Sequence, residues 1–282
     1  MRLRRFSMLV LVLVLSWFTV SARAGTIDGF AALGSSTVTN TGPTTILGNL
    51  GLSPGSSITG TGSITQTGTT YIGPLTLAGT GQTDATNAYN TLSVLPVGAV
   101  NESGHDLGTL GPLAPGTYYF TSSAELTGTL DLDAGATDGG IWTFVINSTL
   151  TTASASMVEI TDTGSAGEFT GNINWIVGQS ATLGTTTAFL GTIISDASDT
   201  LTTGATVGCG GVIALTGAVT LDNNTIDALP ADCAVASTGS PVGPPTPPPT
   251  ATTPEPGTFA LLPSGLLALA FLAFRKSRPR HS

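Results

Sequence analysis

The chain has 282 residues, enough for one domain of about 200 residues with shorter segments at both ends. All eight Lys and Arg residues lie before Gly25 or after Phe274, so the region between them has no lysine or arginine while it keeps its acidic residues. This distribution excludes a cationic surface for nucleic acid and any chemistry that needs a lysine or an arginine.

Threonine makes up roughly one residue in five of this central region, well above ordinary usage, whereas charged residues are scarce. The content of Val, Ile, Leu and Phe is ample for a core, so the composition does not indicate disorder. Because threonine is branched at Cβ, it suits a pleated β surface. A threonine-rich surface with little charge favours a partner that is neutral, ordered and rich in hydroxyls.

The N-terminal segment, residues 1–24, has the features of a secretory signal peptide. Basic residues precede an apolar run over residues 6–20, and Ala22, Arg23 and Ala24 form an A-x-A cleavage site. We expect the mature protein to begin near Gly25 and to work outside the cytoplasm.

Short β-prone pieces then follow one another at Gly, Ser, Asn and Asp, beginning with residues 34–40 and 46–54. The dipeptide Thr-Leu recurs with a period near 20 residues, which is typical of a solenoid whose stacked coils build the core. It occurs at Thr129-Leu130, Thr149-Leu150, Thr182-Leu183, Thr200-Leu201 and Thr220-Leu221.

One segment, residues 83–95, has a helical period instead. Thr83 is a candidate N-cap, Asp84 suits the positive end of the helix dipole, and Pro96 ends the segment. Apolar residues recur at helical spacing at Ala85, Ala88, Tyr89 and Leu92. We expect this helix to lie along one flank of the solenoid.

The segment after the helix offers weak candidates for chemistry. His105 with Glu102 and Asp106 is better explained as a solvated loop than as a metal site, so we predict neither a metal nor a cofactor. Residues 141–146 and 173–177 read as strands, and their Trp and Phe side chains are expected to pack in the core or on a flank.

Cys209 and Cys233 form an even pair, which in an exported protein predicts a disulfide bond. Closing a loop of about 25 residues stabilises a fold by about 3 kcal/mol in the chain-entropy description.

Residues 234–253 form a Pro- and Thr-rich linker, and residues 254–282 follow it as a tail. The tail has Pro254, Glu255 and Pro256, then an apolar run over residues 258–274 and a basic end. An apolar run of about 17 residues can just span a bilayer. This order closely resembles the PEP-CTERM sorting signal of Gram-negative bacteria. The apolar run and the basic end predict membrane anchoring before processing. The resemblance implies cleavage by an exosortase and delivery to the cell surface or exopolysaccharide.

The domain at residues 25–233 is similar to the microbial ice-binding proteins that have a discontinuous β-solenoid. The matching stretches are FAALGSSTVTNTGPTTILGNLGLSPGSSITG, NINWIVGQSATLGTTTAFLGTIISDAS and TGAVTLDNNTI. The resemblance implies a mainly β fold: a right-handed solenoid of triangular cross-section with one long flanking helix and the N-terminal segment docked beside the last coils. It further implies that the protein binds ice through one flat face, and we expect a monomer.

Coils in such a solenoid stack at about 4.7 Å, and outward side chains along a strand repeat near 6.7 Å, both close to repeat distances of the ice lattice. We therefore expect a flat threonine array to order water as ice does and to inhibit ice growth and recrystallisation. The predicted face consists of Ser36, Thr37, Thr39, Thr185, Thr187, Thr203, Thr206, Asn224 and Thr225. A bulky substitution at Thr206 should abolish ice shaping.

Two other functions fit parts of the sequence. A stiff solenoid held in exopolysaccharide could be a structural or adhesive matrix protein without activity on ice. A polysaccharide-acting enzyme would need paired carboxylates, for which Asp131, Asp133 and Asp138 are candidates. We expect no enzyme, because acidic residues at coil corners usually form turns. Calcium binding is not favoured either, since the glycine-rich calcium repeat is absent.

Overall fold

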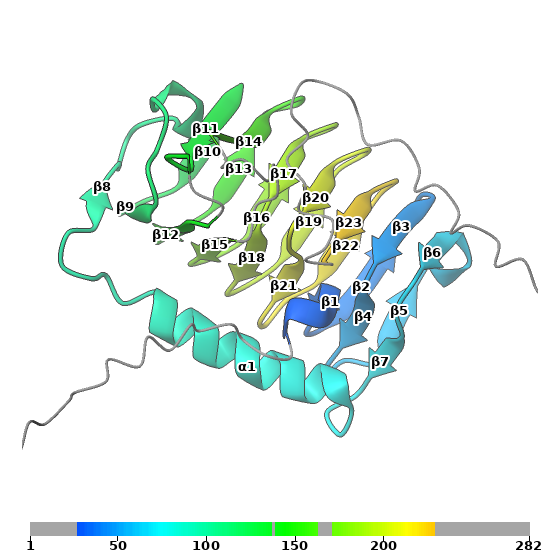
Figure 1. The fold of residues 1–282 in the computed structure, drawn as a ribbon. Helices are drawn as coiled ribbons and strands as arrows, with labels where there is room; N and C mark the ends of the chain where they lie inside the picture. The colour runs from blue at the N-terminus through cyan, green and yellow to red at the C-terminus, as the bar shows by residue number, and fades with distance from the viewer. Residues whose placement is uncertain (1–26, 137–138, 163–170, 229–282) are drawn as a thin grey trace, which may run out of the picture. The chain divides into compact units, whose positions relative to one another are not determined.

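The computed structural model of the chain describes residues 27–136, 139–162 and 171–228. Within them the fold is mainly β, with three parallel sheets and one α-helix (Figure 1). Three short 3-10 helices accompany these elements at Ile27–Gly29, Thr61–Ser63 and Leu107–Thr109. The predicted β-solenoid with one flanking helix is confirmed.

Sheet A has nine strands among the described residues and sheets B and C have seven each. In spatial order, sheet A consists of β7 (Thr70–Ile72), β4 (Asn49–Leu52), β1 (Phe30–Gly34), β21 (Val212–Ala214), β18 (Thr192–Ser195), β15 (Asn172–Val177), β12 (Ile141–Ile146), β9 (Gly116–Phe120) and β8 (Val100–Asn101). Sheet B consists of β10 (Ala124–Leu126), β13 (Leu150–Thr152), β16 (Ala181–Leu183), β19 (Asp199–Leu201), β22 (Val219–Leu221), β2 (Thr37–Asn40) and β5 (Ser57–Thr59). Sheet C consists of β11 (Thr129–Asp133), β14 (Met157–Thr161), β17 (Ala188–Leu190), β20 (Thr206–Gly208), β23 (Thr225–Asp227), β3 (Thr44–Leu47) and β6 (Ile64–Gln66).

Each complete coil contributes one strand to each sheet, as β18, β19 and β20 do. The turn from sheet B to sheet C repeatedly places one residue in the left-handed region, including Thr186 (φ 57°), Gly204 (φ 75°) and Asn223 (φ 55°). Gly and Asn adopt this conformation most easily, and they punctuate the sequence at these corners.

The core lies inside the coils. Leu183, Leu201 and Leu221 stack in register on the inner side of sheet B, and all three are buried. Between the wider coils the rings of Phe144 and Trp175 stack with centroids 4.1 Å apart. The predicted core role of these aromatic residues is confirmed.

The solenoid is discontinuous in sequence. The first coil of the chain follows the last one in space, because β1 pairs with β21, β2 with β22 and β3 with β23. This confirms the expected docking of the N-terminal segment beside the last coils. In Figure 1 the blue N-terminal strands accordingly lie next to the yellow C-terminal strands.

The chain crosses between the two ends of the solenoid through α1 (Leu77–Leu92) and the residues after it. A helix of 16 residues spans about 24 Å, and nine strands at about 4.8 Å spacing span about 38 Å. The helix therefore covers much of sheet A, and residues 93–99 complete the connection to β8.

The helix begins earlier than predicted, because its N-cap is Thr76 and not Thr83. The Oγ1 of Thr83 donates to the carbonyl of Gly79 within the helix (3.0 Å). Gly79 and Gly81 obscured this first part, since glycine has low helix propensity. Gly81 is buried against Phe30, so a tertiary contact explains its presence in the helix.

The predicted Thr-Leu repeat is confirmed for three of its five members. Thr182, Thr200 and Thr220 lie side by side on sheet B. Thr129 lies on sheet C instead. Thr149-Leu150 is two residues out of register, because Thr151 is the residue that pairs with Thr182.

Several sequence predictions concern residues outside the described ranges, namely the signal peptide at 1–24, the linker at 234–253, the tail at 254–282, Asp138 and Cys233. Cys209 is not a free thiol, but its pairing with Cys233 stays a prediction. No helix of the described part of the chain is long and apolar enough to cross a membrane.

We expect Gly81→Ala to destabilise the domain by about 1–3 kcal/mol, although alanine favours a helix. The added Cβ would lie 2.8 Å from a ring carbon of the buried Phe30 and would force the helix away from sheet A. Thermal unfolding followed by circular dichroism measures the change. Gly62→Ala is the control, because nothing lies within 4 Å of its Cβ position. Equal unfolding temperatures for the two variants would contradict the tight packing.

Candidate functional site

The outer side of sheet B carries one uninterrupted row of threonines. In register across the sheet, the row runs through Glu125, Thr151, Thr182, Thr200, Thr220, Thr39 and Thr59. No bulge interrupts these pairings, so the residues repeat once per coil. We call these seven positions the threonine row.

The hydroxyls of the six threonines in this row have no hydrogen-bond partner among the described residues. Each hydroxyl can therefore donate one hydrogen bond and accept others from outside the protein. This distinguishes the threonine row from most threonines at the coil corners, which bond to neighbouring backbone or side chains.

A second row of small hydroxyl residues runs beside it, two residues earlier along the strands. This row is less regular, because Ala218 interrupts it and several of its hydroxyls bond within the protein. Thr149 Oγ1 donates to Ser123 Oγ (2.8 Å), and Ser198 Oγ accepts from the amide of Ala218 (3.1 Å). Sheet B thus presents hydroxyls and methyls, with Glu125 at its edge as the one charge in the two rows.

A carboxyl group lies buried directly behind the threonine row. Asp199 is fully buried between the inward positions of Ala181 and Val219. Its Oδ1 accepts a hydrogen bond from Ser195 Oγ (2.5 Å), and its Oδ2 has no hydrogen-bond partner among the described residues. Burial raises the pKa of Asp199 from 3.8 to about 7, although the bond from Ser195 acts in the opposite direction.

Sheet C is less regular than sheet B. Its outer row passes through Thr129, Met157 and Ala188 before it reaches four threonines, Thr206, Thr225, Thr45 and Thr65. The adjacent outer positions mix carboxylates with apolar residues, and they include Asp131, Glu159, Leu190, Asp227 and Leu47. Hydrated carboxylates interrupt any ordered array of water on this side.

Sheet A has an outer side of mixed chemistry. One outer row contains Ile176, Ile194, Ile213 and Leu33, which are buried against Ala78 and Ala85 of α1. A second outer row is polar and contains Thr117, Thr143, Asn174 and Thr192. Sheet B is therefore the one of the three sheets whose outer side is uniform in chemistry and is not covered by any other described part of the chain.

The structure does not bring the nine predicted face residues onto one surface. Thr37 and Thr39 lie on sheet B, and Ser36 is exposed just before them. Thr206 and Thr225 lie on sheet C. Thr185 and Thr203 are exposed at the corner between the two sheets, where Thr203 Oγ1 donates to a carboxylate oxygen of Asp222.

The remaining two predicted residues are buried and so cannot form part of a surface. Thr187 is fully buried, and its hydroxyl bonds to Thr152 Oγ1 (2.8 Å) and to the carbonyl of Ala153 (3.1 Å). Asn224 is 2% exposed, and its Nδ2 donates to the carbonyls of Thr202 and Ala205. Both side chains hold the corner turns together.

Most of the threonine row was missed as a surface, although its signal is in the sequence. The triplets at 181–183, 199–201 and 219–221 read ATL, DTL and VTL, so threonine alternates with inward residues at the two-residue period of a strand. The repeated Thr-Leu was interpreted as a mark of the coil and not as the outward row itself.

A family model described as Ice-binding-like matches residues 32–227. The chain belongs to the ice-binding-like family. An ice-binding protein from Nostoc sp. (strain HG1) is 41% identical over 284 residues, which cover 97% of this chain and 96% of the relative.

Solved structures of this family have the same fold. The ice-binding protein from an Antarctic biological consortium superposes with a TM-score of 0.65 at 39% identity and covers 72% of this chain and 89% of its own. The ice-binding protein from the ascomycete Antarctomyces psychrotrophicus gives 0.64 at 34% identity and covers 73% and 97%. This ice-binding-like chain therefore shares its fold with both of these solved ice-binding proteins.

The other predicted polar clusters have local structural roles in this ice-binding-like domain. Glu102 Oε2 bonds to His105 Nδ1 (3.0 Å), and Asp106 Oδ1 accepts from the amide of Gly108 (2.8 Å). Asp131 Oδ1 accepts from Thr161 Oγ1 (2.5 Å). Among the described residues, no group of three or more His, Cys, Asp and Glu side chains could hold a metal ion.

We expect the domain to lose stability as the pH rises from 3.8 to about 7. In this window the folded state keeps a proton on Asp199 that the unfolded state has released, so rising pH favours unfolding. Asp199→Asn should flatten this part of the profile, because the amide carries no titrating proton and can still accept the bond from Ser195. Denaturant unfolding at several pH values tests this, and an unchanged slope in the variant would contradict it.

Proposed function

We propose that this protein binds ice through the outer side of sheet B and thereby inhibits ice growth and recrystallisation. The observation that carries the proposal is the threonine row, in which six free hydroxyls repeat once per coil. Membership of the ice-binding-like family and similarity to named ice-binding proteins support it.

The geometry of sheet B explains how the row could hold water in an ordered pattern. Stacked coils repeat at about 4.8 Å, and outward side chains repeat near 6.7 Å along each strand, so the two rows form a two-dimensional grid. The hydroxyl of each threonine can bond a water molecule of the ice surface, while its methyl group occupies a cage between water molecules. Restricted χ1 rotation keeps both groups in place before ice is met.

Adsorption on ice inhibits growth by a simple physical effect. Ice can advance only between bound molecules, so its surface becomes curved there, and curvature lowers the local freezing point. The protein needs no enzymatic step and no cofactor for this action, and it can act as a monomer.

We propose that the protein is exported and processed at its C-terminus. The support is in the sequence: a signal peptide at residues 1–24, and a tail that resembles PEP-CTERM sorting signals, with Pro254, Glu255 and Pro256 before an apolar run and a basic end. Processing by an exosortase would place the domain outside the cell, at its surface or in exopolysaccharide. In an oxidising environment Cys209 would pair with Cys233 after the last coil.

The second candidate function is a structural or adhesive protein of the exopolysaccharide matrix. The low charge and continuous β-stacking of the domain suit a stiff component that resists proteases, and the sorting signal would deliver it there. The two functions differ in their effect on ice, which only the first requires.

We expect Thr200→Tyr, at the centre of the threonine row, to remove most ice shaping and recrystallisation inhibition. The tyrosine ring would stand above the flat array and separate its neighbours from ice. Ice shaping and recrystallisation would be measured with residues 25–237, which contain every described element, after folding is checked by circular dichroism.

Thr206→Tyr is the matched control, because Thr206 lies on sheet C. It should leave ice shaping unchanged, in contrast to the expectation from sequence alone. Activity lost in Thr206→Tyr and kept in Thr200→Tyr would move the site to sheet C. A folded parent domain without any effect on ice would favour the matrix function.

We also expect Glu125→Thr to increase thermal hysteresis at equal molar concentration. The change replaces an exposed, hydrated carboxylate at the end of the row by a seventh threonine. Glu159→Thr is the control, since it removes the same charge from sheet C. A similar increase in both variants would point to net charge as the cause and not to the length of the row.

A further inference from the structure

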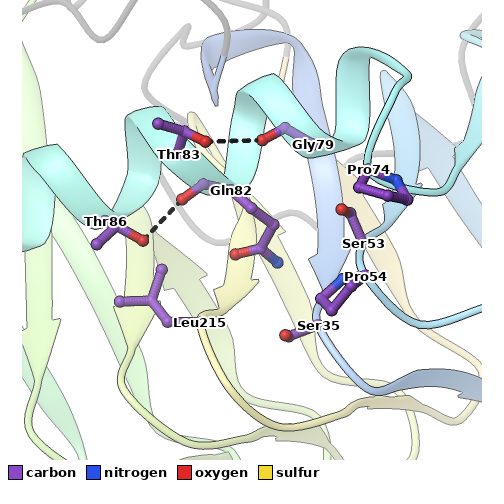
Figure 2. A pocket seen from close by; sticks show the side chains of 9 residues that line it. All are labelled: Ser35, Ser53, Pro54, Pro74, Gly79, Gln82, Thr83, Thr86 and Leu215. Carbon is purple, nitrogen blue, oxygen red and sulfur yellow. Dashed lines mark hydrogen bonds between the residues drawn. The ribbon is translucent and has the colours of Figure 1, made fainter.

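A groove lies beside the helix, at the corner where sheet A passes into sheet B (Figure 2). Its volume is about 320 Å³. One wall is the side of α1 that carries Gly79, Gln82, Thr83 and Thr86. The other wall comes from the chain before β2, after β4 and after β21.

Two serines on the coil side present hydroxyls that have no partner among the described residues. Ser35 is 8% exposed and Ser53 is 3% exposed, yet their Oγ atoms reach the groove. Because both Oγ atoms are open to the groove, each can donate one hydrogen bond to a ligand and accept others.

The helix side of the groove adds one hydrogen-bond acceptor, the side-chain oxygen of Gln82. Gln82 Nε2 donates to the carbonyl of Ala214 (3.1 Å), and this bond fixes the amide group. Its Oε1 has no partner among the described residues. The hydroxyls of Thr83 and Thr86 donate to helix carbonyls, so their oxygens are left to accept bonds.

The chemistry of the lining selects a neutral ligand. None of the nine residues that line the groove is charged. The groove therefore lacks a cation for a phosphate or a uronate, and it lacks an anion for an amine. Pro54, Pro74 and Leu215 add apolar surface that suits C–H groups.

We propose that this groove binds a neutral saccharide. A sugar ring offers hydroxyls that both donate and accept, which match Ser35, Ser53 and Gln82, and C–H groups for the two prolines and Leu215. The volume is at the lower end of small-molecule sites, about 300–1,000 Å³, which suits a mono- or disaccharide unit. The ligand is either a free sugar or one unit of a longer neutral glycan.

This site is independent of ice binding. None of the residues that line the groove belongs to the threonine row. A bound saccharide leaves the centre of sheet B uncovered, so the domain can hold a glycan and ice at the same time.

Titration of the ¹⁵N-labelled whole chain, exported from an expression host, tests the proposal by NMR. The probes are glucose, cellobiose and cellohexaose, with glycerol and galacturonic acid for comparison. We expect saturable shifts of the amides of Ser35, Ser53 and Gln82 with the neutral sugars and none with the other two. Tighter binding of cellohexaose than of glucose would indicate a glycan chain, and equal binding a free sugar.

Two variants test whether the sugar binds in this groove. Ser53→Ala removes one hydrogen bond and should weaken binding about fivefold. Thr83→Trp should abolish binding, because the indole would fill the groove from an exposed helix position. Thr80→Trp is the matched control, since Thr80 is exposed on the same helix outside the groove, and it should bind as the parent does.

Three results would overturn the proposal: no shift at the groove with any of the neutral sugars, equal shifts with galacturonic acid, or unchanged binding in Thr83→Trp. None of these results depends on activity on ice, so failure of this site and failure of the ice-binding function are separate outcomes.

Discussion

The structure depends on parallel backbone pairing that holds successive coils in register. Because side chains alternate along a strand, one register places Leu183, Leu201 and Leu221 inside and Thr182, Thr200 and Thr220 outside. A shift of one residue would exchange the two sets, so the buried leucines and the outward threonines are determined together. The regularity of the outer row follows from the packing of the inner one.

Pairing between the first and last coils extends this regularity beyond one continuous segment. Thr39 and Thr59 enter the row only because β2 pairs with β22 and β5 with β2. This arrangement requires the chain to cross from the first coils to the far end of the solenoid, and α1 makes most of that connection. The helix in turn covers the apolar outer side of sheet A, which would otherwise be a large exposed hydrophobic surface.

The outer sides of the three sheets therefore differ in what they contact and in their chemistry. Sheet A holds the helix, sheet C carries a mixed and partly acidic surface, and sheet B carries a uniform array of hydroxyls and methyls. The outer threonine row is uniform although the inward residues of the same strands are not. Asp199 occupies an inward position at which the neighbouring coils have Ala181 and Val219. The groove beside α1 is a further polar site, and it exists because the helix lies against the corner of sheets A and B.

The sequence by itself determined the solenoid, its repeat and the presence of one helix. These features arise from local periods: a coil of about 20 residues, a two-residue alternation in strands, and a helical spacing at Ala85, Ala88, Tyr89 and Leu92. The start of the helix was misplaced, because Gly81 lies in it for the sake of a contact with Phe30, 51 positions earlier. Local propensity contains no information about such a contact.

Only the tertiary structure decided which threonines share a face. Thr206 and Thr220 each precede an apolar residue in a short strand, yet one lies on sheet C and the other on sheet B. Thr187 and Asn224 look like surface residues in sequence and are buried at corners instead, where they bond to backbone carbonyls. The reason is geometric: the face of a residue depends on where each coil turns, and the turns are set by left-handed residues and by pairing with neighbouring coils.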